Sequence, residues 1–334
     1  MKITIIIPVY NVSRYIARCL NSVVSQDYHG QIECIIVNDC TPDDSMAKVS
    51  AIISQYHGKI DFKIIEHEIN KGLSGARNTG IRNATGDYVY FLDSDDEITP
   101  GCISSLAYVA EKHTGVDIVQ GNIVVTDEKY RYLELSRYNF PKFSSDSAWI
   151  HHHMLTDIPA TSWNKLIRKS FLIGNQLWFK EGIIHEDEHW KFMSAHLIQN
   201  IAFCDTPTYI YYRNPGSITE TPYKDRSLLS WLEIYSDYLT LVKGDKDYHS
   251  IFSQLSYLTL GTHPFKDAGK MEAAYQCFLH RMSRSTALPF FARIGFGYAR
   301  RPSRAVRIFT RLFLRRAYRL IKHIGHLTAT QSNK

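Results

Sequence analysis

Short apolar runs alternate with amphipathic stretches through the first third of the chain. The apolar runs predict four strands, at residues 3–9, 32–37, 62–65 and 88–92. Helical spacing of apolar residues predicts three helices between them, at 11–25, 45–56 and 75–84. Strands that alternate with helices are joined by right-handed crossovers into a parallel sheet. We therefore expect an α/β fold with a mainly parallel sheet and helices on both of its faces.

The pattern changes after about residue 120. Residues 121–220 are mixed and rich in Trp, Tyr and His, which we interpret as a second half packed on the sheet of residues 1–120. We predict that 1–220 form one domain and that 221–334 form a helical C-terminal region. Its clearest helix spans about 303–322, with one basic stripe formed by Arg304, Arg307, Arg311, Arg315, Arg319 and Lys322.

Composition places the chain among ordinary globular proteins, with 44% hydrophobic and 22% charged residues. The net charge of +6 is uneven, because no Asp or Glu follows Glu272 while many Lys and Arg do. A basic amphipathic helix at 303–322 suits an anionic membrane surface, although a helix docked on the acidic body is the simpler alternative. Nothing resembles a nucleic-acid-binding motif, so we expect no nucleic-acid partner.

The cysteines and the apolar segments indicate a location. The six cysteines form no C-x-x-C pair, which argues against a zinc knuckle and fits a reducing compartment. No stretch reaches the roughly 18–20 apolar residues that a membrane span needs. The apolar start of the chain is short and has no cleavage site, so we do not expect a signal peptide.

The strand at 88–92 runs directly into three carboxylates, Asp93, Asp95 and Asp96. Asp93 and Asp95 are two residues apart, which would place them on one face of a continued strand. Close carboxylates repel each other unless a cation lies between them, and hard divalent cations bind both carboxylate and phosphate oxygens. The alternative is a solvated acidic turn that caps the next helix.

Polar segments follow the other three predicted strands as well. They read Ile-Pro-Val-Tyr-Asn at 7–11, Asn-Asp-Cys-Thr-Pro-Asp-Asp-Ser at 38–45 and Asn-Lys-Gly-Leu-Ser-Gly-Ala-Arg-Asn-Thr-Gly at 70–80. With 93–96, these segments resemble the donor half of inverting family 2 glycosyltransferases, which have the GT-A fold, over residues 3–97. More loosely, 163–168, 186–187 and 211–219 resemble the acceptor half of bacterial polysaccharide- and lipopolysaccharide-assembly members.

The resemblance implies roles for individual residues. Asp95 and Asp93 would hold a divalent cation, Mn²⁺ or Mg²⁺, with Asp95 the direct ligand. The residues implied in donor binding are Pro8, Val9, Tyr10, Asp39, Asn70, Gly72, Arg77, Asp93 and Ser94. Asp39 could instead be a helix N-cap, and Arg77 a structural ion-pair partner. The chain departs from the usual family pattern at Asn38 and Cys40, where Asp and Gly are common.

The resemblance also implies that Asp187 is the general base and that Glu186 orients the acceptor or the base. The alternative is an acidic helix start, which the helix dipole stabilises. Residues 185–189 also fit the zinc-protease pattern H-E-x-x-H, but Ala195 stands where one such class has its third histidine. Trp163 could stack on an acceptor sugar or anchor the core. Arg213, Ser217 and Thr219 could close over the phosphates or form a plain loop.

Together these features predict a peripheral, cytoplasmic enzyme at the inner face of the cell membrane. It would transfer a sugar from a nucleotide-diphospho-sugar, a UDP-hexose or UDP-N-acetylhexosamine, to a glycan or lipid-linked glycan acceptor in surface polysaccharide synthesis. A catalytically inactive nucleotide-sugar-binding module anchored by the basic tail is the alternative. A sugar-nucleotide-forming enzyme is disfavoured, because Tyr10 and Asn11 replace the glycine-rich basic loop that such enzymes carry after their first strand.

Overall fold

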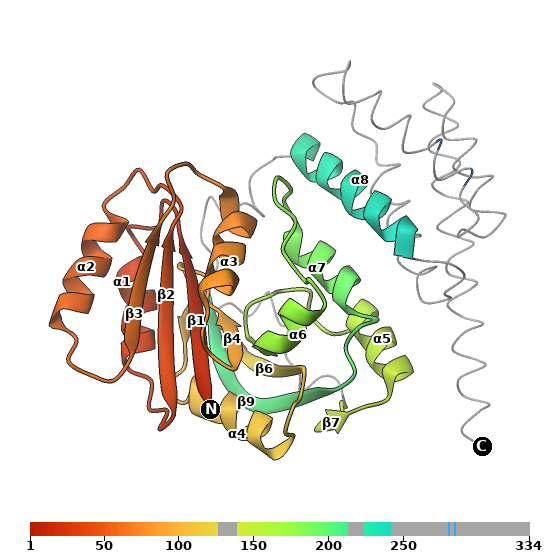
Figure 1. Cartoon of the computed structure of the whole chain (residues 1–334), viewed down its shortest axis with the longest axis horizontal. Coiled ribbons are helices and arrows are strands. Elements are labelled where there is room, and N and C mark those ends of the chain that lie inside the picture. Colours follow the sequence, from red (N-terminus) through yellow and green to blue (C-terminus); the bar gives the residue numbers. More distant parts are fainter. Residues whose placement is uncertain (126–138, 213–223, 242–279, 281–283, 285–334) are drawn as a thin grey trace. The chain divides into compact units, whose positions relative to one another are not determined.

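The computed structural model describes residues 1–125, 139–212, 224–241, 280 and 284 (Figure 1). The chain divides into two compact units. The first comprises Met1–Gly182 and Glu186–Thr221, and the second comprises Ile183–His185 and Pro222–Lys334. The second unit contains helix α8, Lys224–Leu241, which lies within the C-terminal region 221–334 that we predict to be helical. The predicted basic helix at 303–322 and residues 213–219 lie outside the described residues.

All seven elements predicted between residues 3 and 92 are present. They are β1 (Lys2–Val9), α1 (Ile16–Val24), β2 (Gln31–Asn38), α2 (Ser45–Gln55), β3 (Asp61–Glu66), α3 (Gly72–Asn83) and β4 (Tyr88–Phe91). The helix α1 begins five residues later than predicted. Asn11, where we predict its start, has a φ of 54°, a left-handed conformation that an α-helix cannot contain. The remaining elements of the first unit are β5 (Glu97–Ile98), α4 (Cys102–Lys112), β6 (Ile118–Val125), β7 (Phe143–Ser144), α5 (Ser147–Thr156), β8 (Lys165–Arg168), α6 (Lys169–Gly174), α7 (Glu186–Ser194) and β9 (Ile201–Tyr211).

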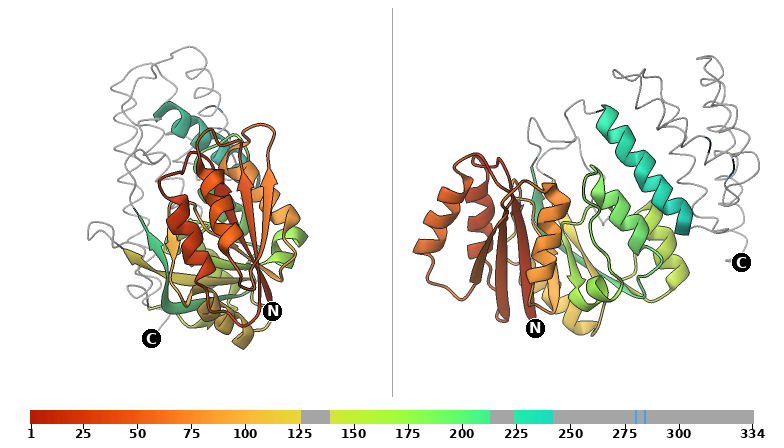
Figure 2. Two further views of the ribbon diagram at one scale, coloured as in Figure 1. Left: turned by 90° about the vertical axis from the view of Figure 1, so that its left-hand side faces the viewer. Right: turned by 45° about the horizontal axis from the view of Figure 1, so that its top comes forward.

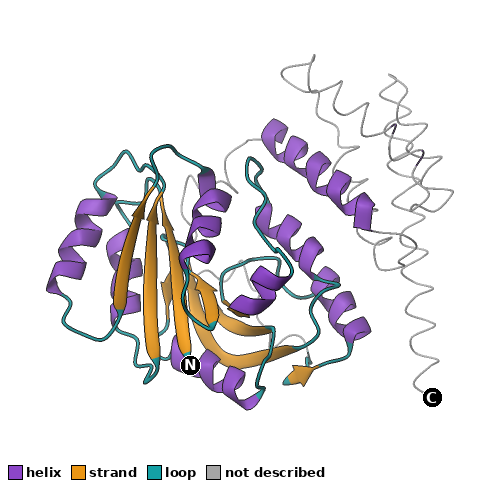
Figure 3. Ribbon diagram, in the orientation of Figure 1, coloured by secondary structure: helices purple, strands orange, loops and turns teal. Residues whose placement is uncertain are grey.

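The described strands form one sheet in the order β3-β2-β1-β4-β8-β6-β9-β5, with β7 paired to β9 (Figure 3). Strands β3, β2, β1 and β4 are parallel, as the alternating pattern predicts. Beyond β4 the sheet is mixed, because β8 runs antiparallel to both of its neighbours while β6 and β9 are parallel to each other. The α/β prediction is confirmed, and its parallel character belongs to the first half of the sheet.

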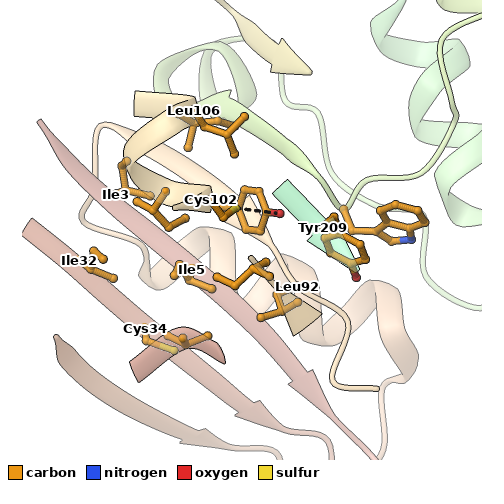
Figure 4. Close-up of a cluster of buried hydrophobic side chains, with 14 of the residues drawn as sticks. Ile3, Ile5, Ile32, Cys34, Leu92, Cys102, Leu106 and Tyr209 are labelled. Carbon is orange, nitrogen blue, oxygen red and sulfur yellow. Dashed lines mark hydrogen bonds between the residues drawn. The ribbon is translucent and has the colours of Figure 1, made fainter. Parts of the chain in front are cut away.

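Helices cover both faces of the parallel half, with α1 and α2 on one side and α3 on the other (Figure 2). Ile3, Ile5 and Ile7 of β1 are fully buried in a core that also contains Leu20 of α1 and Leu106 of α4 (Figure 4). On the opposite face, α3 packs so closely on β1 that a Cβ added at Gly80 would lie 2.3 Å from Cγ2 of Ile6. This packing fixes the start of α3 near the carboxyl ends of the parallel strands, where ligands of such sheets bind.

Candidate active site

The acidic loop that follows β4, residues 93–96, is held in place by contacts from α1. The guanidinium Nη2 of Arg18 donates to the backbone carbonyl of Asp95 over 2.7 Å, and the Cys19 thiol lies 3.7 Å from the carbonyl of Asp93. Ser94 is buried, whereas Asp93 and Asp95 are only partly covered. Helix α4 begins six residues later, with no side-chain cap. The loop therefore does not cap the next helix, and the carboxylates of Asp93 and Asp95 remain partly accessible.

Asp96, the third carboxylate of the loop, is a buried anchor. Its two carboxylate oxygens accept hydrogen bonds from the hydroxyl of Tyr209 and the backbone N–H of Tyr212, both over 2.8 Å. Burial, together with the negative charges of Asp95 and Asp93, raises the pKa of Asp96 to about 8. Asp96 thus ties the loop to the end of β9, across more than 110 residues of sequence.

Arg77 of α3 joins the acidic loop to the start of α7. Its side chain is 1% exposed. One terminal nitrogen donates to Asp93 over 2.8 Å, and the other donates to Glu186 and Asp187 over 2.8 and 2.9 Å. The ring of Phe179 lies 5.2 Å from the guanidinium carbon. One buried cation therefore brings together carboxylates that are about 90 residues apart in the sequence.

Negative charge exceeds positive charge around Arg77. Burial raises the pKa of Asp93 from 3.8 to about 6, and the carboxylates of Asp95 and Asp187 add to the effect against the opposing guanidinium. Burial and the neighbouring Asp187 raise the pKa of Glu186 from 4.5 to about 7. A divalent cation near Asp93 and Asp95 would relieve this repulsion. Among the described residues no three His, Cys, Asp or Glu side chains form a ready metal cage, so a bound ion would need ligand oxygens as well.

Asp187 lies in the first turn of α7, between Glu186 and Glu188. Its Oδ1 accepts from Arg77, and its Oδ2 accepts from the backbone N–H of Ser162 over 3.1 Å. The side chain is 20% exposed, so it can still be reached from solvent. An acidic helix start, which was the structural alternative, is therefore present. It coexists with a carboxylate that two protein donors hold in a fixed orientation beside the acidic loop.

The observation that decides the family is a match in sequence. Residues 4–172, about half of the chain, match the family model described as glycosyl transferase family 2. The chain belongs to glycosyl transferase family 2.

Two curated relatives illustrate the range of the similarity. EpsJ of Bacillus subtilis (strain 168), an uncharacterized glycosyltransferase, is 34% identical over 230 residues, which are 66% of this chain and 64% of EpsJ. TarS of Staphylococcus aureus (strain Mu50), a poly(ribitol-phosphate) beta-N-acetylglucosaminyltransferase, is 26% identical over 215 residues, which are 63% of this chain and 35% of TarS. The matched region thus spans less than two thirds of either relative.

Solved structures confirm the GT-A fold. The crystal structure of S. aureus TarS 1-349 in complex with UDP-GlcNAc has a TM-score of 0.68 at 21% identity and covers 96% of this chain and 92% of that one. The mannosyltransferase PcManGT from Pyrobaculum calidifontis, in complex with GDP-Man and Mn²⁺, has a TM-score of 0.54 at 17% identity and covers 97% and 86%. In the described part of this family 2 chain, no helix is both long and apolar enough to cross a membrane.

The residues predicted to bind the donor's base and ribose lie at the ends of β1 and β2. Pro8 and Val9 are buried in the strand, whereas the Tyr10 side chain is 49% exposed. Asp39 is 2% exposed, and its carboxylate accepts from the backbone N–H groups of Lys71 and Gly72 over 2.8 Å. Asp39 therefore caps α3 from a distant part of the sequence, which explains why α3 begins three residues earlier than predicted.

Two more side chains, those of His67 and Asn70, form hydrogen bonds with Asp39. The His67 ring nitrogen Nδ1 lies 2.7 Å from Asp39 Oδ1, and its other nitrogen lies 2.8 Å from the hydroxyl of Thr79. The side-chain amide of Asn70 donates to the Asp39 carbonyl over 3.1 Å. Gly72 has a φ of 75°, which explains the glycine at this turn. Asp39, Asn70 and Gly72, which are predicted to bind the nucleotide-sugar donor, thus form one hydrogen-bonded group at the start of α3.

The departure from the family pattern at Cys40 has a structural consequence. Cys40 has a φ of 58°, the left-handed conformation that glycine adopts without strain. Asn38 keeps the turn in shape, because its side-chain oxygen accepts from the backbone N–H of Thr41 over 2.9 Å. Cys40 is exposed, whereas the other free cysteines of the described part are buried.

The structure disfavours two alternative interpretations of the sequence: the zinc-protease pattern at 185–189 and the stacking of Trp163 on an acceptor sugar. His185 has a φ of 66° and precedes α7, so it does not share a helix with His189 as the zinc-protease pattern requires. Trp163 is 6% exposed, and its ring stacks on Tyr209 with centroids 4.4 Å apart and on Tyr211 at 5.7 Å. These contacts favour the interpretation of Trp163 as a core anchor.

Several residues that hold the site in place are not identified by any sequence pattern. Arg18 and Tyr209 contact the acidic loop. Lys165 donates to a carbonyl of segment 159–162, which in turn contacts Asp187. Arg18 also pairs with Glu97 over 3.1 Å. The contacts of Arg18 and Tyr209 join residues that are distant in the sequence, and Lys165 binds backbone carbonyls, so no local spacing pattern identifies the three residues. The pattern W-N-K at 163–165 was the single available signal, and it pointed to Trp163 rather than to the lysine.

Proposed function

We propose that this family 2 chain is an inverting glycosyltransferase that uses a nucleotide-diphospho-sugar. The observation that carries the proposal is the position of Arg77. Its guanidinium donates both to Asp93, in the loop suited to a cation, and to Asp187, the candidate base. Inverting transfer needs a group that neutralises the leaving diphosphate and a base near the incoming hydroxyl. Both groups lie within reach of one side chain.

Asp95 and Asp93 are the residues that would hold Mn²⁺ or Mg²⁺. When bound there, the ion would act as a Lewis acid toward the diphosphate oxygens. Two features fit this role: the excess of carboxylates around Arg77 and the raised pKa of Asp93. The mannosyltransferase PcManGT, whose solved structure is a complex with GDP-Man and Mn²⁺, shares the fold and supports this proposal.

Asp187 would accept the proton of the acceptor hydroxyl. The hydroxyl oxygen forms a bond to the anomeric carbon, the bond from that carbon to the diphosphate breaks, and the carboxylate takes the proton. A base positioned in this way accelerates transfer by about 10²–10⁴-fold. Glu186, whose pKa burial raises to about 7, would orient the acceptor or the base. Pro8, Val9, Tyr10 and the group around Asp39 would contact the nucleoside.

We further propose a UDP-hexose or UDP-N-acetylhexosamine donor and a glycan or lipid-linked glycan acceptor in surface polysaccharide synthesis. The TarS structure with UDP-GlcNAc supports the donor class, because it has the same fold. The basic residues at 303–322 support a peripheral position at the inner face of the cell membrane. Deleting 300–334 should then abolish sedimentation with anionic vesicles and leave donor binding unchanged; a shortened chain that still sediments would contradict the membrane role.

A panel of UDP-, GDP- and dTDP-sugars with Mn²⁺ or Mg²⁺ tests the activity. We expect one class of nucleotide sugar to raise the melting temperature of the protein and to be cleaved with release of its nucleoside diphosphate. We expect Asp95→Asn to abolish this release. Asp187→Asn should keep the thermal shift and lose the release. Donor binding without any release in the native chain would favour the inactive binding module, and normal release by Asp95→Asn would remove Asp95 as the metal ligand.

A further inference from the structure

Lys165, the first residue of β8, is a buried lysine that the proposed chemistry does not use. Its side chain is 1% exposed, although a lysine normally keeps its ammonium group in water. Burial lowers the pKa of Lys165 to about 7, against the favourable charge of Asp187. Burying an apolar residue at this position in the sheet would cost less free energy. The burial of the amino group of Lys165 therefore calls for a structural or functional explanation.

The amino group of Lys165 holds the segment between α5 and β8. It donates to the carbonyl oxygen of Pro159 over 2.9 Å and to that of Thr161. Both the charged and the neutral amine have enough N–H groups for two carbonyls. The next residue after Thr161 is Ser162, which is fully buried and whose backbone N–H donates to Oδ2 of Asp187. The contacts therefore run from Lys165 through this short segment to the candidate base.

The two oxygens of Asp187 are held in different ways. Arg77 binds Oδ1 through a charged side chain, and Ser162 binds Oδ2 through the backbone. A backbone donor is only as well placed as the segment that carries it. Segment 159–162 has no regular secondary structure, and Lys165 supplies two of the hydrogen bonds that fix it.

We propose that Lys165 is a positioning residue for glycosyl transfer: its amino group fixes segment 159–162 so that the Ser162 N–H orients the carboxylate of Asp187. This inference rests on the proposed role of Asp187 as the base. Because Lys165 is only 1% exposed, it would act through this segment rather than by touching donor or acceptor. A base displaced by about 1 Å lowers the rate by about 10²-fold, whereas donor binding at the ends of β1 and β2 does not depend on it.

The test compares Lys165→Met with the control Lys169→Met. Lys169 also donates to a backbone carbonyl, that of Ala84 over 2.9 Å, but it lies at the amino end of β4, opposite to Asp93. The assay measures UDP release from UDP-N-acetylglucosamine with Mn²⁺, or from the most active donor of the panel. We expect Lys165→Met to lower kcat by about 10–100-fold with donor KM within about twofold of the native value. Lys169→Met should leave both constants within about twofold.

Lys165→Gln, whose amide keeps N–H donors, is the second variant and should recover part of the lost kcat. The proposal is overturned if folded Lys165→Met keeps kcat within about twofold, or if KM rises as much as kcat falls. It is also overturned if neither variant folds, because Lys165 would then be a residue required for folding alone. Asp187→Asn separates the two claims: full activity in that variant refutes the base itself, whereas its inactivity beside an active Lys165→Met refutes only the role of Lys165.

Discussion

Replacing Arg77 with methionine is the sharpest perturbation that the structure offers. Arg77 is buried, and it makes three charged hydrogen bonds of 2.8 or 2.9 Å to carboxylates whose side chains are 13–24% exposed. Methionine fills a similar volume and removes the positive charge. Three carboxylates would then face one another without a cation, since the hydrogen bonds to Arg77 are their shared interaction.

The expected loss of stability follows from these contacts. A hydrogen bond to a charged group contributes about 1.5–3 kcal/mol, and removal of one partner from a buried ion pair costs about 3–5 kcal/mol. The three carboxylates are partly hydrated and can take up protons, so the three bonds do not simply add. We therefore expect Arg77→Met to lower the free energy of unfolding by about 3–5 kcal/mol at pH 8.

The loss should depend on pH in a defined direction. A carboxyl group with a higher pKa in the folded than in the unfolded chain lowers stability as the pH rises between the two values. In the native chain this interval runs from 3.8 to about 6 for Asp93 and from 4.5 to about 7 for Glu186. Arg77 lowers both pKa values, so its removal extends the interval upward. The difference between native and Arg77→Met chains should thus be smaller at pH 5 than at pH 8.

Urea unfolding at both pH values, followed by circular dichroism, measures the effect. The control is Arg82→Met, the same change at an exposed position of the same helix, which should cost less than about 0.5 kcal/mol. Arg77→Lys should be intermediate, because an ammonium keeps the charge without the planar geometry. A loss below about 1 kcal/mol for Arg77→Met, or a loss that shrinks with rising pH, would refute the assigned role of Arg77.

Three further predictions concern the same half of the chain. Cys40→Gly should raise the free energy of unfolding by about 1 kcal/mol, because it relieves a left-handed φ of 58°; a loss in urea unfolding would show that the turn is not strained. Gly80→Ala should lower it by about 1–3 kcal/mol, because the new Cβ would lie 2.3 Å from Ile6 Cγ2; an unchanged midpoint would contradict this close packing. Mn²⁺ affinity, titrated in the presence of UDP, should weaken as the pH falls through about 6, because binding must displace the proton of Asp93; constant affinity from pH 5 to 8 would place the ion elsewhere.

The first four strands could be predicted from the sequence because each contains a short run of mostly apolar residues bounded by polar turns. The helix starts could not, since they depend on contacts that are not local. The start of α3 at Gly72 is set by the carboxylate of Asp39, and the left-handed conformation of Asn11 excludes that residue from α1. The antiparallel pairing of β8 between β4 and β6 also leaves no mark in the periodicity, because strand direction does not alter which side chains are buried.

The candidate site divides in the same way. The acidic residues stand out in the sequence because charged side chains directly follow a buried strand, and the family resemblance supplied roles for them. Arg77, which joins Asp93 to Asp187, was predicted only in general terms, as a residue near the diphosphate or the acidic loop. The supporting residues Arg18 and Lys165 were missed, because each acts through backbone carbonyls that no sequence pattern reveals.

The most direct measurement is an anomalous difference map from a crystal soaked with UDP and Mn²⁺. We predict a manganese peak within coordination distance, about 2.0–2.2 Å, of a carboxylate oxygen of Asp95 or Asp93, with the diphosphate bound to the same ion. A nucleotide that binds far from this loop, or a manganese peak beside other residues, would contradict it.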